Sequence, residues 1–248
     1  MFTDLKNKVV VVTGGVTGIG GAAALGFAAQ GAKVFAQYLG GGDEMNAIKS
    51  AGIKTMKLDL TENSAPQILI DAALKEFGRI DVLVNNAGSL VARTQLDALN
   101  DDFIDKVFDL NCRQLIHCCR IAAEHMKAQK SGNIINVTSI AARNGASPGG
   151  SVYAGAKGFV SAFTKTIARE LVDYNIRVNC VSPGTIHTAF HDRFSTAEKR
   201  AAVAKSIPMQ RLGLADDCTG TFLYLASDKA SAYVTGQVIE VNGGQLMA

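Results

Sequence analysis

Tyr153 and Lys157 stand one helical turn apart in the stretch SVYAGAKG, and their side chains together could move a proton. Residues at this spacing lie on one face of an α-helix, so the phenol and the ammonium can share a cleft. A free phenol has a pKa of about 10 and is a poor base at neutral pH, but a nearby cation favours its phenolate form. The pair indicates acid–base chemistry at a hydroxyl or carbonyl oxygen. Alone it is weak, because a tyrosine and a lysine can also simply pack together.

Two further polar residues could assist this chemistry. Ser139 ends the strand-like stretch NIINVTS, where a hydroxyl can hydrogen-bond a substrate oxygen and stabilise charge that develops on it. Asn111 lies in DLNCRQ, inside a long helical stretch. Each residue has an ordinary alternative, because Ser139 can cap a strand end and Asn111 can be a satisfied buried amide.

A glycine-rich stretch, TGGVTGIG at 13–20, follows the first apolar run and opens an alanine-rich helical stretch. Gly14 permits the sharp turn, Gly18 lets backbone amides approach a pyrophosphate, and Gly20 allows close packing of helix on strand. The N-terminus of the following helix adds partial positive charge. Because the strand, loop and helix occur in the required order, the pattern favours nucleotide binding over a plain turn.

Apolar runs alternate with helical stretches along the whole chain. This alternation predicts an α/β fold, a Rossmann-like doubly wound parallel sheet of about seven strands with helices on both faces. No linker divides the chain, so residues 1–248 are expected to form a single dinucleotide-binding and catalytic domain. The least regular part, 184–212, follows the sixth strand, where a substrate lid is expected. Strands are expected at 8–13, 33–38, 53–60, 80–88 (with a loop), 133–139, 176–184 and 237–244, and helices at 21–30, 40–52 (with a turn), 64–77, 99–128 and 151–173.

Composition excludes several classes of function. The net charge is only +3, and no basic run or membrane-length apolar stretch is present, so we expect neither nucleic acid nor a membrane as a partner. The five cysteines form no C-x-x-C pair, which is typical of a reducing cytoplasm. Cys112, Cys118 and Cys119 lie near His117, but buried helix positions explain them better than a metal site, and no metal is expected.

Several motifs in a fixed order resemble those of the short-chain dehydrogenase/reductase family. They are the Gly-x-x-x-Gly-x-Gly spacing, NNAG at 85–88, Tyr-x-x-x-Lys, PG at 183–184 and VNGG at 241–244, and they cover essentially the whole chain. The resemblance implies an NAD(P)-dependent oxidoreductase that moves a hydride between nicotinamide and a secondary alcohol or ketone. It implies a catalytic tetrad of Asn111, Ser139, Tyr153 and Lys157. Tyr153 would be the general acid/base, Lys157 would tune it and bind the nicotinamide ribose, and Asn111 would support a water relay.

The resemblance also implies which residues contact the cofactor. Asp59 and Leu60 would border the adenine, and Pro183 and Gly184 would border the nicotinamide. The complete set of expected cofactor positions is Gly14, Thr17, Gly18, Ile19, Gly20, Tyr38, Asp59, Leu60, Asn86, Ala87, Gly88, Tyr153, Lys157, Pro183, Gly184, Ile186 and Thr188.

The choice between NAD and NADP depends on the end of the second strand. An NAD-selecting carboxylate belongs there, and this chain has Tyr38 instead. NADP-using members of the family place a basic residue at positions that here hold Thr17 and Leu39. The missing carboxylate favours NADP slightly, and the missing basic residue leaves NAD open.

The substrate is expected to be a small molecule, and its candidate contacts lie in two segments. Arg143, Asn144 and Ser147 stand between Ser139 and Tyr153, while His187 and His191 open the expected lid. Such residues suit a sugar, polyol or sugar acid, although the charged ones are equally well explained as solvated loop residues.

Two other functions remain as alternatives. A 3-oxoacyl-(acyl-carrier-protein) reductase is disfavoured because Tyr174 and Asn175 stand where a carrier-binding arginine is expected. A non-catalytic dinucleotide-binding sensor would not need the tetrad. The family resemblance further implies a homotetramer in which the helices at 99–128 and 151–173 pair with other copies.

Overall fold

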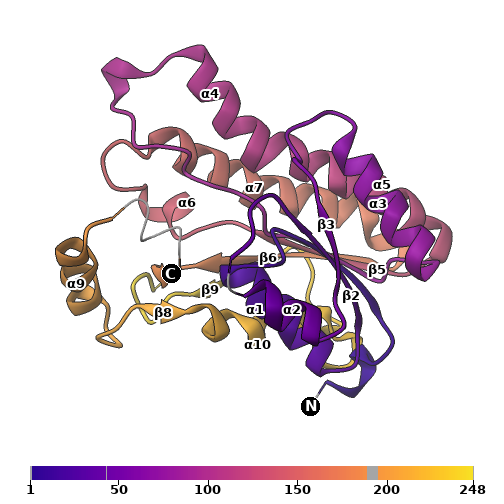
Figure 1. The fold of residues 1–248 in the computed structure, drawn as a ribbon. Helices are drawn as coiled ribbons and strands as arrows, with labels where there is room; N and C mark the ends of the chain where they lie inside the picture. The colour runs from indigo at the N-terminus through magenta and orange to yellow at the C-terminus, as the bar shows by residue number, and fades with distance from the viewer. Residues whose placement is uncertain (1, 43, 189–194, 248) are drawn as a thin grey trace.

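Seven parallel strands form one sheet in the order β3-β2-β1-β4-β5-β6-β9, as Figure 1 shows for this computed structural model. The structure describes residues 2–42, 44–188 and 195–247. The predicted doubly wound parallel sheet is therefore confirmed. The strands of this sheet are β1 (Val9–Thr13), β2 (Lys33–Tyr38), β3 (Lys54–Lys57), β4 (Val82–Asn85), β5 (Gly132–Val137), β6 (Ile176–Pro183) and β9 (Val238–Val241), and a separate pair is β7 (Ile186–His187) with β8 (Gly213–Leu214).

Helices cover both faces of the sheet (Figure 1). On one face lie α3 (Ala65–Phe77), α4 (Asp101–Phe108), α5 (Gln114–Gln129) and α7 (Ser151–Leu171), and on the other lie α1 (Gly18–Ala29), α2 (Met45–Ser50) and α10 (Ala215–Ala226). The shorter elements are α6 (Ala141–Asn144), α9 (Ala197–Ser206), α11 (Asp228–Ser231), η1 (Thr3–Leu5), η2 (Leu96–Ala98) and η4 (Val172–Tyr174). None of the described helices combines the length and hydropathy needed to cross a membrane.

The two faces of the sheet bury separate hydrophobic cores. Val11 of β1 packs with the helices α3, α5 and α7, whereas its neighbours Val10 and Val12 pack with Phe27 of α1 and Phe222 of α10. All five residues are fully buried. A strand covered on both faces has no solvent side, which explains why β1 is apolar at consecutive positions.

The predicted helical stretch at 99–128 contains a π-helical turn, and this turn carries Asn111. Helix α4 ends at Phe108, a π-helical turn, η3, spans Asp109–Arg113, and α5 follows. A π turn disturbs the regular backbone hydrogen bonds, and polar side chains here bind the carbonyls of this region. Asn111 Nδ2 donates to Val107 O at 2.8 Å, and Gln114 Nε2 donates to Leu110 O at 3.2 Å. The predicted long helical segment is therefore confirmed, and the π turn within it was not predicted.

The region after β6 is more regular than predicted. The stretch 184–212 contains β7 and helix α9, whose first turn is capped by Thr196 Oγ1 accepting from Lys199 N at 3.3 Å. Helix α10 was not predicted from the sequence. Its start is stabilised by the Asp217 side chain, which accepts a hydrogen bond from Leu214 N at 2.7 Å.

Candidate active site

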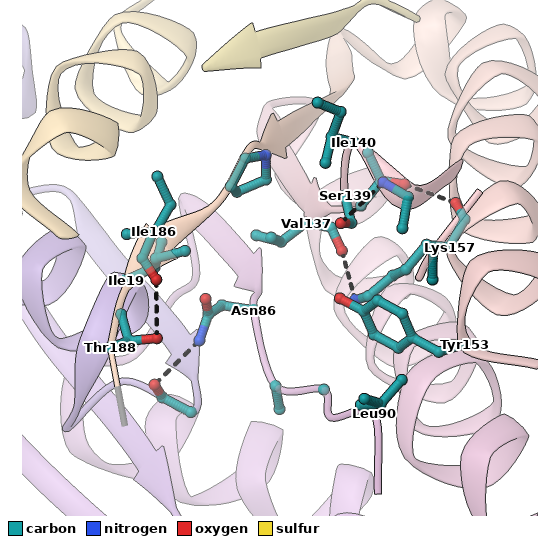
Figure 2. Close-up of a pocket in the computed structure, with 18 of the residues that line it drawn as sticks. Ile19, Asn86, Leu90, Val137, Ser139, Ile140, Tyr153, Lys157, Ile186 and Thr188 are labelled. Atoms are coloured by element: carbon teal, nitrogen blue, oxygen red, sulfur yellow. Dashed lines mark hydrogen bonds between the residues drawn. The ribbon is translucent and has the colours of Figure 1, made fainter. Parts of the chain in front are cut away.

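A cavity of about 480 Å³ opens at the carboxyl ends of β1, β4, β5 and β6. The order of the strands reverses between β1 and β4, and ligands of doubly wound sheets bind at such a switch point. Figure 2 shows that the cavity has two sides, with Ile19, Asn86, Ile186 and Thr188 on one and the Ser139–Tyr153–Lys157 group on the other.

The loop between β1 and α1 has the geometry of an anion site. Gly14 and Gly18 have φ angles of 59° and 56°, a left-handed conformation that favours glycine. Helix α1 begins at Gly18, and its N-cap Thr17 makes no side-chain capping bond to the first turn. The N–H groups there can therefore bind the pyrophosphate of a dinucleotide. A Cβ at Gly20 would overlap Gly14 O and the Asn86 side chain, so this glycine lets the helix approach the loop.

The segment after β4 is held against this loop. Thr13 Oγ1 accepts hydrogen bonds from Asn86 N and Ala87 N, both at 3.0 Å. Asn86 Nδ2 in turn donates to Thr13 O and Gly14 O, both at 3.1 Å. These bonds tie the carboxyl ends of β1 and β4 into one wall of the cavity.

Ser139, Tyr153 and Lys157 meet on the other wall. Tyr153 shares a side-chain hydrogen bond with Ser139. Lys157, on the same face of α7, places its Nζ atom 5.7 Å from the centre of the Tyr153 ring and donates to Val137 O at 2.9 Å (Figure 2). Serine hydroxyl, phenol and ammonium thus form a group that can bind an oxygen atom and move a proton.

Asn111 lies behind this group, not in the cavity wall. Its Nδ2 donates to Ser89 O at 2.8 Å, and its Oδ1 accepts from Ser89 N at 3.2 Å. A Cβ built on Gly88 would stand 2.7 Å from Asn111 Oδ1 and 3.0 Å from Lys157 Nζ. Asn111 and Lys157 therefore both lie against Gly88.

Burial controls the ionisation of the tyrosine and the lysine. It raises the pKa of Tyr153 to about 12, and the hydrogen bond with Ser139 offsets this rise only in part. It lowers the pKa of Lys157 to about 8. Desolvation penalises the charged form of each side chain, which is phenolate for one and ammonium for the other. In the chain by itself, burial outweighs the lowering of the phenol pKa that we expected from the lysine.

Most of the residues expected from the sequence come together. Those that line the cavity are Gly14, Thr17, Gly18, Ile19, Asp59, Leu60, Asn86, Ala87, Gly88, Ser139, Asn144, Ser147, Tyr153, Lys157, Pro183, Gly184, Ile186 and Thr188. Gly20 packs behind the loop at Gly14 and Asn86, and Asn111 lies behind the group of Ser139, Tyr153 and Lys157. His191 lies outside the residues that the structure describes.

Three expected contacts lie elsewhere. The ring of Tyr38 packs against the core on the α1 side of the sheet, because alternate residues of a strand face opposite ways, and Gln37 and Leu39 line the cavity instead. His187 is exposed on β7, where its neighbour Ile186 takes the inward position. Arg143 is exposed outside the lining and forms an ion pair with Glu240 at 3.6 Å.

Sequence analysis missed several lining residues. Gln245 Oε1 accepts from Thr185 N at 3.1 Å, which brings the C-terminal segment to the cavity. Leu90 and Arg93 come from the loop after β4, and Leu90 lies beside Tyr153 in Figure 2. The loop directly follows NNAG, but no motif marks which of its residues face inward.

Among the described residues, no three His, Cys, Asp or Glu side chains gather as a metal site.

Comparison with known proteins extends over the whole chain. The family model described as enoyl-(acyl carrier protein) reductase matches residues 14–245. The chain is 37% identical over 252 residues to a 3-oxoacyl-(acyl-carrier-protein) reductase from Synechocystis sp., covering 99% of this chain and 100% of that one. It is 38% identical over 255 residues to 3beta-hydroxysteroid dehydrogenase 1 from Eggerthella lenta, covering 100% of this chain and 97% of that one.

Solved structures give the same picture. The NADH-dependent reductase A1-R', described as responsible for alginate metabolism, aligns with a TM-score of 0.89 at 33% identity, covering 99% of this chain and 100% of that one. The same reductase complexed with NAD aligns with a TM-score of 0.89 at 34% identity, with both chains covered in full.

Proposed function

The chain belongs to the short-chain dehydrogenase/reductase family and is an NAD(P)-dependent oxidoreductase acting on CH–OH groups, and we propose that its substrate is a polar sugar, polyol or sugar acid. The observation that carries the proposal is the hydrogen-bonded Ser139–Tyr153 pair, which faces a cavity that is also lined by the polar side chains of Asn144, Ser147 and Gln245. Hydroxylated substrates can hydrogen-bond such side chains, whereas an alkyl chain cannot.

The residues present fit a nicotinamide dinucleotide. The β1–α1 loop offers backbone amides to the pyrophosphate, and Pro183, Ile186 and Thr188 line the same cavity as Ser139 and Tyr153. When bound, the nicotinamide supplies or accepts the hydride.

Each residue of the tetrad has a distinct task in this proposal. Tyr153 gives a proton to the carbonyl oxygen in reduction and removes it from the alcohol in oxidation. Ser139 donates a hydrogen bond to the same oxygen as charge develops. Lys157 holds a positive charge beneath the phenol and binds the nicotinamide ribose. Asn111 supports proton exchange from the lysine, and its bonds to Ser89 fix the loop that covers Lys157.

Cofactor choice stays open between NAD and NADP, with a slight preference for NADP. Gln37 and Leu39 line the cavity beyond β2, and neither carries a carboxylate that would repel a 2′-phosphate. The Gln37 side chain is also occupied, because Oε1 accepts from Gly14 N at 2.9 Å and Nε2 donates to Leu58 O at 2.6 Å. Similarity to a reductase complexed with NAD supports the other cofactor.

A 3-oxoacyl-(acyl-carrier-protein) reductase is the second candidate. Similarity to the Synechocystis reductase favours it. So do two lysines, Lys127 and Lys130, which contact Tyr174 and Asn175. Lys127 Nζ lies 4.7 Å above the Tyr174 ring, and Asn175 Nδ2 donates to Lys130 O at 3.3 Å. Lysines at this site could bind an acidic carrier protein.

Nicotinamide absorbance separates the candidates. Purified protein is mixed with NAD or NADP and a panel of hexitols, aldoses, hexonates and hydroxysteroids, and with NADH or NADPH and an oxoacyl thioester. Turnover of the hydroxylated panel with little turnover of thioester supports the proposal. Turnover confined to the thioester would replace it with the second candidate, and turnover confined to hydroxysteroids would contradict both.

A further inference from the structure

We propose that Arg93 is a specificity residue that binds the carboxylate of a sugar-acid substrate, an inference that rests on the proposed function. Arg93 lies in the loop between β4 and η2, is exposed and lines the cavity. Its planar guanidinium matches the geometry of a carboxylate and can bind both of its oxygens.

Charge within the cavity singles out this residue. Among the described lining residues, only Asp59, Arg93 and Lys157 have charged side chains. Asp59 lies beside Leu60 at the expected adenine end, and its Oδ1 accepts from Thr61 N at 3.0 Å. Lys157 is buried and bonded to Val137 O. Arg93 is therefore the exposed cation in the described lining, and it lies away from the expected adenine end.

The backbone before Arg93 is strained. Val91 has a φ of 65°, and a β-branched residue rarely adopts a positive φ. A tight turn accompanies it, in which Ala92 N donates to Leu90 O at 2.8 Å. Ser89 Oγ accepts from Val91 N at 3.1 Å, and Ser89 itself is held by Asn111. Strain of this kind persists where surrounding contacts enforce it, and it concentrates at functional sites.

A second loop fixes the far side of Arg93. Thr94 N donates to Gly149 O at 3.0 Å, and Gly149 has a φ of 81°. Arg93 Nη1 lies 3.3 Å from Pro148 O and 3.5 Å from Ser147 O. The guanidinium is thus positioned at the loop that supplies Asn144 and Ser147 to the cavity, where a substrate carboxylate and its neighbouring hydroxyls can bind together.

Arg143, the arginine expected from the sequence, provides a matched control. Arg143 is exposed, as Arg93 is, and lies on α6. It forms an ion pair with Glu240 and lies outside the cavity lining. Arg93→Gln and Arg143→Gln remove the same charge, one inside and one outside the cavity lining, so only the first should alter recognition of an acid.

The experiment compares hexonates with the corresponding hexitols, for example gluconate with glucitol. Arg93→Gln should lower kcat/KM for the acids by about tenfold, mainly through KM, because a charge-assisted hydrogen bond is lost. The hexitols should change less than about threefold, Arg93→Lys should restore part of the loss, and Arg143→Gln should change neither. Equal losses for acids and hexitols, or no loss, would overturn the assignment.

A binding measurement keeps this test separate from the proposed function. Gluconate is titrated into cofactor-saturated Tyr153→Phe protein, with and without Arg93→Gln. An affinity about tenfold lower with the second change supports the carboxylate site, and equal affinities overturn it. Failure of the wild-type protein to oxidise any acid, hexitol or aldose would instead contradict the proposed function. Equal or tighter binding of a sugar phosphate would replace the carboxylate with a phosphate as the ligand.

Discussion

The Nζ atom of Lys157 lies 5.7 Å from the centre of the Tyr153 ring, and both side chains come from one face of α7. Burial makes the ammonium easier to deprotonate and the phenol harder. Tyr153 therefore keeps its proton at neutral pH, and the pKa of Lys157 is lowered to about 8. Such opposed shifts are common at active sites.

Tyr153→Phe should lower kcat by about 10²–10⁴-fold while changing cofactor affinity less than about threefold, because only the proton-transferring hydroxyl is removed. Stopped-flow turnover and titration of NAD(P)H fluorescence measure the two quantities. Tyr174→Phe, on the exposed turn η4, is the control and should change neither. Unaltered turnover in Tyr153→Phe would refute the role of this residue.

Lys157→Met should stabilise the protein at pH 7 and abolish its activity. The unfolded chain keeps the lysine proton up to a pKa of 10.5, whereas the folded chain releases it near 8. Between these values the unfolded state binds more protons, so this group makes wild-type stability rise with pH. At pH 7 the buried ammonium lowers the free energy of unfolding of the wild type by about 3 kcal/mol. Lys157→Met removes this loss, but it also removes the hydrogen bond to Val137 O, which costs about 1 kcal/mol.

Urea unfolding at pH 7 and pH 9.5 measures this effect. The free energy of unfolding of Lys157→Met should exceed that of the wild type by about 2 kcal/mol at pH 7, and this difference should shrink at pH 9.5. Lys165→Met, at an exposed position of the same helix, should show no such pH dependence. A constant difference between wild type and Lys157→Met at both pH values would contradict the lowered pKa.

Gly20→Ala should weaken cofactor binding by at least about tenfold. The added methyl would overlap Gly14 O and the Asn86 side chain, so the phosphate loop would have to move. Gly220→Ala in α10 is the matched control, because its Cβ meets no atom within 4 Å. That change should leave binding intact and raise stability by up to about 1 kcal/mol. Equal cofactor affinities in both variants would argue against the assigned loop.

Leu39→Asp should convert the chain to strong selectivity for NAD. Leu39 lines the cavity just beyond β2, and a carboxylate there would repel the 2′-phosphate of NADP. The ratio of kcat/KM values for NADH and NADPH measures the change, which should exceed about tenfold. Tyr38→Asp should have a smaller effect, because position 38 faces the core on the α1 side. The reverse order would show that Tyr38 is the selecting position.

A homotetramer remains a prediction, and α7 offers its test. A Cβ at Gly155 or Gly158 meets nothing within 4 Å in this chain, and Phe159 is 37% exposed beside Phe163, with ring centres 5.6 Å apart. If α7 pairs with another copy, Gly155→Leu should shift the sedimentation coefficient toward smaller species. A wild-type monomer at micromolar concentration would contradict the prediction.

The sequence alone identified the motifs whose function depends on local backbone geometry. TGGVTGIG predicts its own turn and helix start, and Tyr153 with Lys157 share a helix face, so both could be recognised from spacing. The alternation of apolar runs and helices likewise predicted the parallel sheet, because strands buried on both faces must be apolar throughout.

Only the tertiary structure decided which neighbouring side chains face the cavity and how they ionise. Leu39 rather than Tyr38 lines it, since strand alternation has a definite phase only once the register is known. Arg143 forms an ion pair with Glu240, which is distant along the chain. Arg93 is held at the cavity by contacts with a second loop. The pKa values of Tyr153 and Lys157 depend on burial, which results from the packing of many segments and is not encoded in any local pattern.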